Sequence, residues 1–206
     1  IGSKRKKYIR LIIDTKLLTS FSRREKLFSC QVNKQKRQLE DMSKTNFRII
    51  THNDAETESV GERLAEILRP ADVIAFYGDL GAGKTTFVRG LARAMGASER
   101  VSSPTFVLMH IYEGRIPIYH FDAYRLENSE ELLNIGAEEY IGTDGIACIE
   151  WSERTEELLP KDCLRLKIYY RTDLGPTGRE LVFESDGGRG QKIVEALQND
   201  SQENKL

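Results

Sequence analysis

The feature that most constrains this chain is the stretch at residues 78–86, which has the sequence Gly-Asp-Leu-Gly-Ala-Gly-Lys-Thr-Thr. It matches the phosphate-binding loop pattern G-x-x-x-x-G-K-[ST]. The apolar run at 73–77 has the length of a strand, and the apolar residues at 87–95 have the spacing of one helix face. In the order strand, glycine loop, helix, backbone N–H groups and a helix N-terminus can surround a phosphate. The sequence therefore predicts an α/β domain that binds a nucleotide.

Two residues of this loop have expected roles in phosphoryl chemistry. Lys84 is expected to contact the β- and γ-phosphates, and the Thr85 hydroxyl to bind Mg²⁺. No N-K-x-D sequence that could recognise guanine is present, which favours ATP over GTP. The loop residues expected to contact the nucleotide are Gly78, Asp79, Leu80, Gly81, Ala82, Gly83, Lys84, Thr85 and Thr86.

A second acidic residue is needed on the metal, and Glu150 is the best candidate. It ends the apolar run 145–149, as expected for a buried parallel strand whose tip reaches a site. Asp122 follows the expected strand 116–121 and shares a side with His120. For Asp122 two interpretations remain open from the residues alone: it orients water or the metal shell, or it caps the next turn or pairs with Arg125.

Three further features near these acids have both a functional and a structural interpretation. Residues 103–105, Ser-Pro-Thr, could close over the γ-phosphate as a switch segment, or form a plain turn. His120 is expected to be a hydrogen-bonded structural histidine rather than a catalytic one. Trp151, the only tryptophan, could pack near the nucleotide or anchor the core.

The net charge of −1 conceals two differently charged regions. Residues 1–41 contain twelve Lys/Arg and four Asp/Glu, and residues 42–206 contain nineteen and twenty-eight. Because phosphate neutralisation needs clustered cations, the acidic part is not expected to bind nucleic acid by itself. Residues 1–41 are interpreted as a basic N-terminal extension outside the core, since Met42-Ser43-Lys44 resembles a protein start; a basic arm that contacts RNA or a partner is the alternative.

The cysteines and the hydropathy pattern favour a cytoplasmic protein. Cys30, Cys148 and Cys163 are odd in number and form no C-x-x-C pair, which argues for a reducing compartment. No run of about 18 apolar residues, as a membrane span requires, is present, and the basic start has no long apolar region typical of a secretory signal.

Other elements are expected along the chain from their periodicity and turn signals. Residues 47–50 and 180–184 are expected strands, and 106–112 and 116–121 an expected hairpin. Ser59 with Glu62 predicts a helix start, and Pro70 its end. The alternating segment 164–170 is predicted to be an edge strand, and a last helix near 193–197 to fray from Asn199.

Together, four stretches resemble the bacterial TsaE (YjeE) family, whose members are small ATPases needed to make N6-threonylcarbamoyladenosine (t6A) on tRNA. The resemblance covers residues 47–185, and residues 1–41 have no counterpart in the family. Ala123 stands where a leucine is common in the family. The four stretches are residues 78–86, Ser103-Pro104-Thr105-Phe106, His120-Phe121-Asp122-Ala123-Tyr124-Arg125-Leu126 and Ile149-Glu150-Trp151.

The resemblance implies a P-loop NTPase-like, three-layer α/β fold with a mixed, mostly parallel sheet. It implies Thr85 and Glu150 as Mg²⁺ ligands and Lys84, Asp122 and Glu150 as catalytic residues. It also implies that the segment Asp54–Thr57 and the stretch Gly178-Arg179-Glu180 lie near the nucleotide base, with Asp54, Thr57 and Gly178 as nucleotide-binding residues. Family members act with the TsaD–TsaB complex and reach tRNA only through it, and their ATP hydrolysis supports repeated turnover.

The expected function is therefore that of an Mg²⁺-dependent ATPase that is an accessory subunit in tRNA modification and is slow without its partners. Two other classes compete with it. A small-molecule kinase would need an Arg-bearing lid, and no Arg-rich insertion separates Gly96 from Glu150. A nucleotide-gated binding module would keep nucleotide binding without needing hydrolysis.

Overall fold

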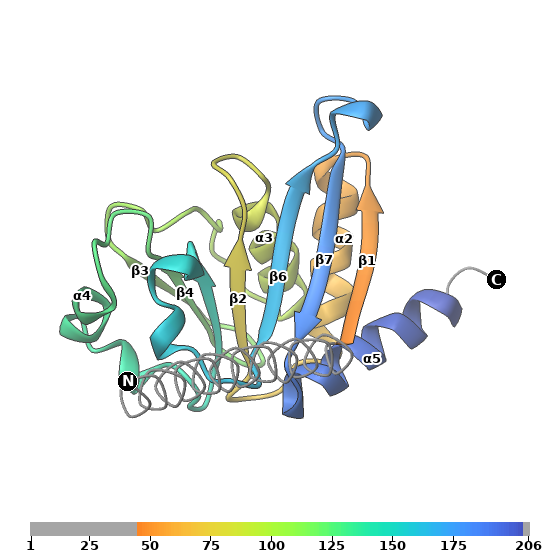
Figure 1. The fold of residues 1–206 in the computed structure, drawn as a ribbon. Helices are drawn as coiled ribbons and strands as arrows, with labels where there is room; N and C mark the ends of the chain where they lie inside the picture. Colours follow the sequence, from red (N-terminus) through yellow and green to blue (C-terminus); the bar gives the residue numbers. More distant parts are fainter. Residues whose placement is uncertain (1–44, 204–206) are drawn as a thin grey trace, which may run out of the picture. The chain divides into compact units, whose positions relative to one another are not determined.

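The computed structural model describes residues 45–203, so the predicted basic extension at 1–41 lies outside the described residues (Figure 1). Within this part of the chain the strands form one seven-stranded sheet. The strands are β1 (Thr45–Thr51), β2 (Val73–Tyr77), β3 (Met109–Tyr112), β4 (Ile118–Asp122), β5 (Ile146–Glu150), β6 (Leu164–Tyr170) and β7 (Arg179–Ser185). The helices are α2 (Asp54–Ala65), α3 (Lys84–Ala94), α4 (Ser129–Asn134) and α5 (Gly188–Glu203), with 3₁₀ helices η1 (Ala137–Glu139), η2 (Ser152–Arg154), η3 (Glu156–Leu158) and η4 (Thr172–Leu174).

The sheet has the strand order β1-β7-β6-β2-β5-β4-β3 and is mixed, as predicted. The central strands β6, β2, β5 and β4 are parallel. Antiparallel pairs flank them, with β7 and β1 on one side and β3 on the other. Half of the six pairings are therefore parallel, and the parallel ones form the centre rather than most of the sheet. β2, β4 and β5 end at one edge of the sheet, where a ligand site of an open α/β fold is expected.

Helices cover both faces of the sheet and give the three predicted layers. On one face, α2, α3 and α5 pack against the strands, with Ile74 and Phe76 of β2 in the same apolar core. Phe87 of α3 lies edge-on to Phe76, with ring centroids 5.6 Å apart. On the other face, Val73 and Ala75 pack against a thinner layer formed by α4 and the 3₁₀ helices. The continuous apolar pattern of β2 thus reflects burial on both faces.

The start of α2 differs from the prediction. The helix begins at Asp54, where the side chain of Asn53 accepts a hydrogen bond from the Glu56 backbone N–H at 2.9 Å. The predicted cap, Ser59, lies inside the helix, which also ends at Ala65, before Pro70. Asn53-x-x-Glu56 has the capping spacing as well, but Ala55 is the one apolar residue of the exposed first turn, so no apolar periodicity marks the helix start there.

The prediction that residues 164–170 form an edge strand is wrong. β6 lies between β2 and β7 and is paired on both sides. Its alternation arises because Leu164, Leu166 and Ile168 face the helices whereas Arg165 and Lys167 lie on the more open face. The alternation of apolar and polar residues therefore indicates which face of β6 is buried. It does not indicate whether the strand lies at the edge or in the centre of the sheet.

Two further boundaries are corrected. The hairpin strand begins at Met109, because the carbonyl of Pro104 accepts hydrogen bonds from the N–H groups of Val107 and Leu108 and turns the chain there. α5 continues past Asn199, since Asp200 accepts a hydrogen bond from Arg63 of α2 at 2.7 Å. None of the helices described between residues 45 and 203 is both long and apolar enough to span a membrane.

Candidate functional site

The glycine loop lies between β2 and α3 and depends on backbone conformations that favour glycine. Gly78, Gly81 and Gly83 have φ angles of 139°, 75° and 110°. A Cβ on Gly78 would stand 2.4 Å from the carbonyl oxygen of Ile168, so the loop also packs closely on β6. Gly83 precedes α3 and provides no side-chain cap, which leaves the first N–H groups of the helix for an anion.

Lys84 is the buried cation of the site, with 4% of its surface exposed. Its Nζ donates to the carbonyl oxygens of Gly78 at 2.5 Å and Asp79 at 3.0 Å. It also lies 4.0 Å from the centroid of the Trp151 ring. Burial lowers the pKa of the Lys84 ammonium. The negative charges of Glu150 and other nearby acids oppose this effect, since they raise the pKa. The site therefore holds a cation that a negatively charged ligand would stabilise.

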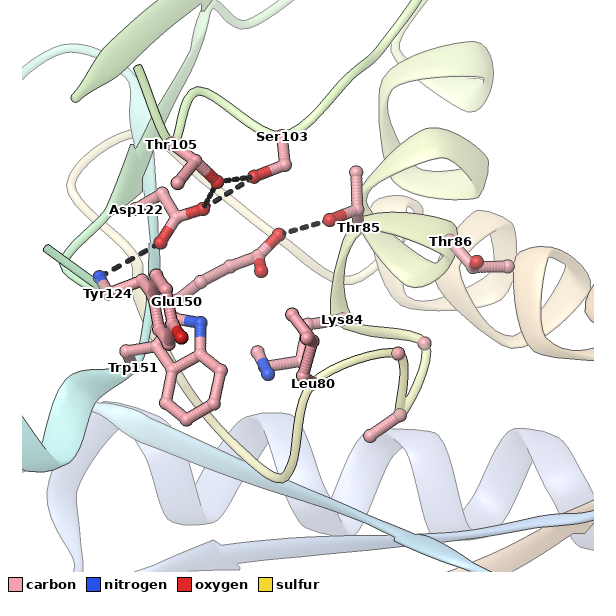
Figure 2. Close-up of a pocket in the computed structure, with 13 residues that line it drawn as sticks. Leu80, Lys84, Thr85, Thr86, Ser103, Thr105, Asp122, Tyr124, Glu150 and Trp151 are labelled. Carbon is pink, nitrogen blue, oxygen red and sulfur yellow. Dashed lines mark hydrogen bonds between the residues drawn. The ribbon is translucent and has the colours of Figure 1, made fainter. Parts of the chain in front are cut away.

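Glu150 ends β5 next to the first turn of α3, as its position after an apolar run predicted. Its carboxylate is 3% exposed, and Oε1 accepts a hydrogen bond from the Thr85 hydroxyl at 2.7 Å (Figure 2). His120 Nε2 lies 2.9 Å from the same Oε1. An acid and a hydroxyl 65 residues apart in sequence are thus adjacent.

Asp122 ends β4 and is paired in register with Glu150 on β5. Its Oδ2 accepts hydrogen bonds from the hydroxyls of Ser103 and Thr105, each at 2.5 Å, and its Oδ1 accepts one from the Tyr124 N–H at 2.9 Å (Figure 2). Asp122 therefore caps the following turn and also holds the segment 103–105 at the site. It has no ion pair with Arg125 among the described residues.

A cavity of about 280 Å³ joins these elements. Of the predicted residues, Leu80 through Thr86, Asp122 and Glu150 line it. Gly78, Asp79, Asp54, Thr57 and Gly178 do not. Gly78 and Asp79 lie at the start of the glycine loop. Thr57 lies near the loop, because its methyl group is 3.9 Å from the position that a Cβ on Gly83 would occupy.

The lining also includes Ser103, Thr105 and Trp151, for which a position near the nucleotide was one of two interpretations, and Tyr124, for which no role was predicted. Trp151 takes a left-handed backbone conformation, with φ at 61°, which is uncommon for a non-glycine residue. Its ring also packs on Tyr124, with centroids 4.9 Å apart. Trp151 thus lines the cavity and also packs against the apolar core on this face, so both positions considered for it from the sequence apply.

Arg179 at the start of β7 belongs to the stretch 178–180 that the resemblance placed near the nucleotide base, and it does not line the cavity. It is buried, and its guanidinium donates to the carbonyl oxygens of Ala82 at 2.8 Å and Gly81 at 3.4 Å. Tyr170, whose ring lies 4.4 Å from the guanidinium carbon, donates to the Leu80 carbonyl at 2.6 Å. β6 and β7 thus hold the glycine loop through its carbonyl groups.

A glycine loop between a parallel strand and a helix, with a buried acid at the end of the neighbouring strand, defines a P-loop NTPase-like α/β protein. A family model described as "Threonylcarbamoyl adenosine biosynthesis protein TsaE" matches residues 51–180. The chain therefore belongs to the TsaE family, whose members carry a name for tRNA threonylcarbamoyladenosine biosynthesis.

Individual relatives agree with this assignment. The chain is 38% identical to the TsaE protein of Bacillus subtilis over 148 residues, which is 71% of this chain and 90% of that protein. It is 46% identical to the TsaE protein of a Nostoc species over 112 residues, 52% of this chain and 68% of that protein. The crystal structure of YdiB from Bacillus subtilis superposes with a TM-score of 0.66 at 32% identity, covering 77% of this chain and 97% of that one.

Proposed function

We propose that this chain is a cytoplasmic, Mg²⁺-dependent ATPase that serves as an accessory subunit in the t6A modification of tRNA. The observation that carries the proposal is the contact of Thr85 with Glu150 beside the glycine loop. A hydroxyl at the start of the helix and an acid at a strand end are the two groups that hold magnesium in P-loop NTPases.

The phosphates would be held by the loop N–H groups, the N-terminus of α3 and Lys84. Lys84 Nζ now donates to two neutral carbonyl groups, those of Gly78 and Asp79. Charge-assisted hydrogen bonds to phosphate are roughly twice as strong as neutral ones. The exchange of partners would therefore favour ATP binding at this site.

Thr85 and Glu150 fit a magnesium ion, which takes one or two carboxylates together with phosphate oxygens and water. When bound, the ion would neutralise charge that develops on the γ-phosphoryl group. The chain's own contribution is positional, because Glu150 is already buried and oriented toward Thr85. Little covalent help is needed for this reaction.

Asp122 would position the attacking water or the metal shell, and it links that role to the segment 103–105. The cavity lining contains no arginine among the described residues. The guanidinium of Arg125 lies 5.6 Å from the Phe106 ring centroid, away from the lining. We therefore expect slow hydrolysis by the isolated chain and faster hydrolysis with the TsaD–TsaB complex. tRNA would be reached through that complex, since residues 42–206 are acidic.

The test compares Glu150→Gln with Glu138→Gln, an exposed acid of η1 that serves as the matched control. Glu150→Gln should lower Mg²⁺-dependent ATP hydrolysis by about 100-fold, the size expected for one lost electrostatic group. Nucleotide binding, measured by calorimetry, should survive in both variants. Unchanged hydrolysis in Glu150→Gln would refute the proposal.

A nucleotide-gated binding module is the second candidate. It is favoured by the side chain of Asp122, which in the described residues accepts hydrogen bonds from Ser103, Thr105 and the Tyr124 N–H and thereby positions the chain. Asp122→Ala separates the two functions. Loss of both turnover and t6A formation in a reconstituted TsaD–TsaB assay supports the ATPase. Loss of turnover with undiminished t6A formation over many cycles supports the module.

A further inference from the structure

His120 is a buried histidine that the proposed function has not used. It has 0% exposure, lies on β4 and does not line the cavity. Its register partner on β5 is Cys148, two positions before the pair Asp122 and Glu150. The face of the sheet that carries His120 is otherwise apolar here, with Ile118 and Cys148 in the core under α3. Burying an imidazole among such residues costs free energy unless it has a partner.

The one hydrogen-bond partner of the His120 ring in the described residues is Oε1 of Glu150, at 2.9 Å. The other ring nitrogen, Nδ1, is buried and has no partner among residues 45–203. An N–H at Nδ1 would therefore be an unsatisfied donor. The arrangement favours the tautomer that carries its proton on Nε2, so that Nε2–H donates to the carboxylate.

Oε1 of Glu150 consequently accepts two hydrogen bonds, one from His120 and one from Thr85. Oε2 accepts none from the described residues, although Glu150 lines the cavity. The carboxylate is thus fixed through one oxygen, and the other remains for a ligand. Of the two donors, Thr85 is itself an expected metal ligand, which makes His120 the donor that serves only to orient Glu150.

We propose that His120 is the positioning residue of Glu150: its Nε2–H fixes the carboxylate so that a divalent cation on the nucleotide is bound in one orientation. This inference rests on the proposed function, because it takes Glu150 as a metal ligand. Hydrogen-bond partners of metal ligands of this kind change metal affinity by about 10–100-fold when they are removed. The same magnitude is expected for His120.

Two substitutions separate positioning from mere support of the fold. His120→Leu fills a similar volume without a donor. His120→Gln places an amide N–H close to the position of Nε2 and should restore the contact. Cys148→Ala, at the register partner, is the control, because it perturbs the same buried layer without touching the carboxylate.

The first measurement is the affinity of Mn²⁺ for the ADP-loaded protein, followed by electron paramagnetic resonance, and it does not depend on turnover. His120→Leu should weaken Mn²⁺ binding by about tenfold or more, and His120→Gln should return it to within about threefold of the parent. Cys148→Ala should leave it unchanged. The second measurement is hydrolysis, where His120→Leu should raise the half-saturating Mg²⁺ concentration and lower kcat while the KM for ATP stays within about twofold.

The outcomes distinguish this inference from the proposed function. If the parent hydrolyses ATP and His120→Leu binds Mn²⁺ like the parent while unfolding at lower temperature, His120 is structural and the inference is overturned. If the parent binds Mn²⁺·ADP without hydrolysing ATP and His120→Leu binds it weakly, the ATPase proposal falls and the inference stands. A parent chain that binds no Mn²⁺ with ADP overturns both.

Discussion

The two sides of the cavity are built by different means. On the loop side, nine consecutive residues take their shape from glycine backbone conformations and from carbonyl groups held by Arg179 and Tyr170. On the acid side, residues from three separate segments meet through side-chain hydrogen bonds, in which Asp122 and Glu150 are the acceptors. One side is fixed by backbone geometry, and the other by contacts that a rotamer change can break.

This difference indicates which side of the cavity would contribute mainly to ligand binding and which mainly to turnover. In the proposed function, a loop held by its backbone would lose little entropy on binding phosphate, so it would supply most of the affinity. The segment 103–105 is held by two hydroxyls on one carboxylate oxygen and carries exposed Phe106 and Val107 just beyond it. Its contacts can rearrange with the state of the nucleotide or with a partner. Substitutions on the loop side should therefore affect binding, and those on the acid side turnover.

The largest effect is expected for Lys84→Met on the loop side. Methionine can fill the space beside Trp151 without the charge, so phosphate binding loses its buried cation while the fold is retained. ATP affinity should fall by about 100-fold, in the range of other single electrostatic groups at phosphoryl sites. Isothermal calorimetry measures it, with exposed Lys192→Met on α5 as the control.

Thermal unfolding of the ligand-free protein completes this test. Because burial lowers the pKa of Lys84, removing the charge should leave the free protein at least as stable as the parent. If Lys84→Met bound ATP as tightly as the parent, the loop side would not supply most of the ATP affinity.

A smaller effect is expected for Arg179→Lys, which tests the support beneath the loop. The guanidinium donates to carbonyl groups of Gly81, Ala82, Pro176 and Gly178, and an ammonium cannot span them. Unpaired buried carbonyl groups cost about 1–3 kcal/mol, so the free energy of unfolding should fall by that order. ATP affinity should drop by about threefold to tenfold with kcat unchanged, because a looser loop pays more entropy on binding.

Arg171→Lys on the same hairpin is the matched control, since Arg171 forms an exposed pair with Asp173. Such pairs contribute about 0–1 kcal/mol. Chemical denaturation and calorimetry on both variants decide the matter. Equal losses in the two would mean that the hairpin, rather than the Arg179 guanidinium, supports the loop.

The same contrast explains what the sequence could predict. The loop side is contiguous, so its motif identified Lys84 and Thr85 directly. Glu150 was predicted because a buried strand that ends in an acid delivers that acid to the edge of a parallel sheet. The contact of His120 with Glu150 depends on β4 lying beside β5 in one register, and no local pattern specifies that pairing. The resemblance placed the stretch 178–180 near the nucleotide base, but the support that Arg179 gives the loop was not predicted, because its loop partners are backbone carbonyl groups 97 and 98 residues away.

The predictions of where α2 begins and where β6 lies in the sheet were wrong for a related reason. Asn53 and Ser59 each stand three positions before a glutamate, and α2, which packs mainly against α3, is capped by Asn53. β6 alternates like an edge strand, although it lies beside β2 in the centre. In both cases the local pattern was real but did not by itself decide the structure.

The smallest effect is expected on the acid side, for the double variant Ser103→Ala, Thr105→Val. It removes both hydroxyl donors to Asp122 Oδ2 and leaves the Tyr124 N–H contact intact. Each hydrogen bond contributes about 0.5–1.5 kcal/mol net, less where water can replace the donor, so kcat should fall by about twofold to tenfold with ATP affinity unchanged. Ser102→Ala, next to the segment and without a side-chain contact to Asp122 in the described residues, is the control.

Hydrogen exchange gives this last comparison its sharpest form. Without the two hydroxyls, the turn in which Pro104 accepts from the N–H groups of Val107 and Leu108 should open more often, and those two amides should exchange faster. The amides of the glycine loop should exchange at the parent rate, because their support comes from Arg179 and Tyr170 on the other side of the cavity. Faster exchange throughout the glycine loop would show that the two sides are one cooperative unit, and the division between binding and turnover would then fail.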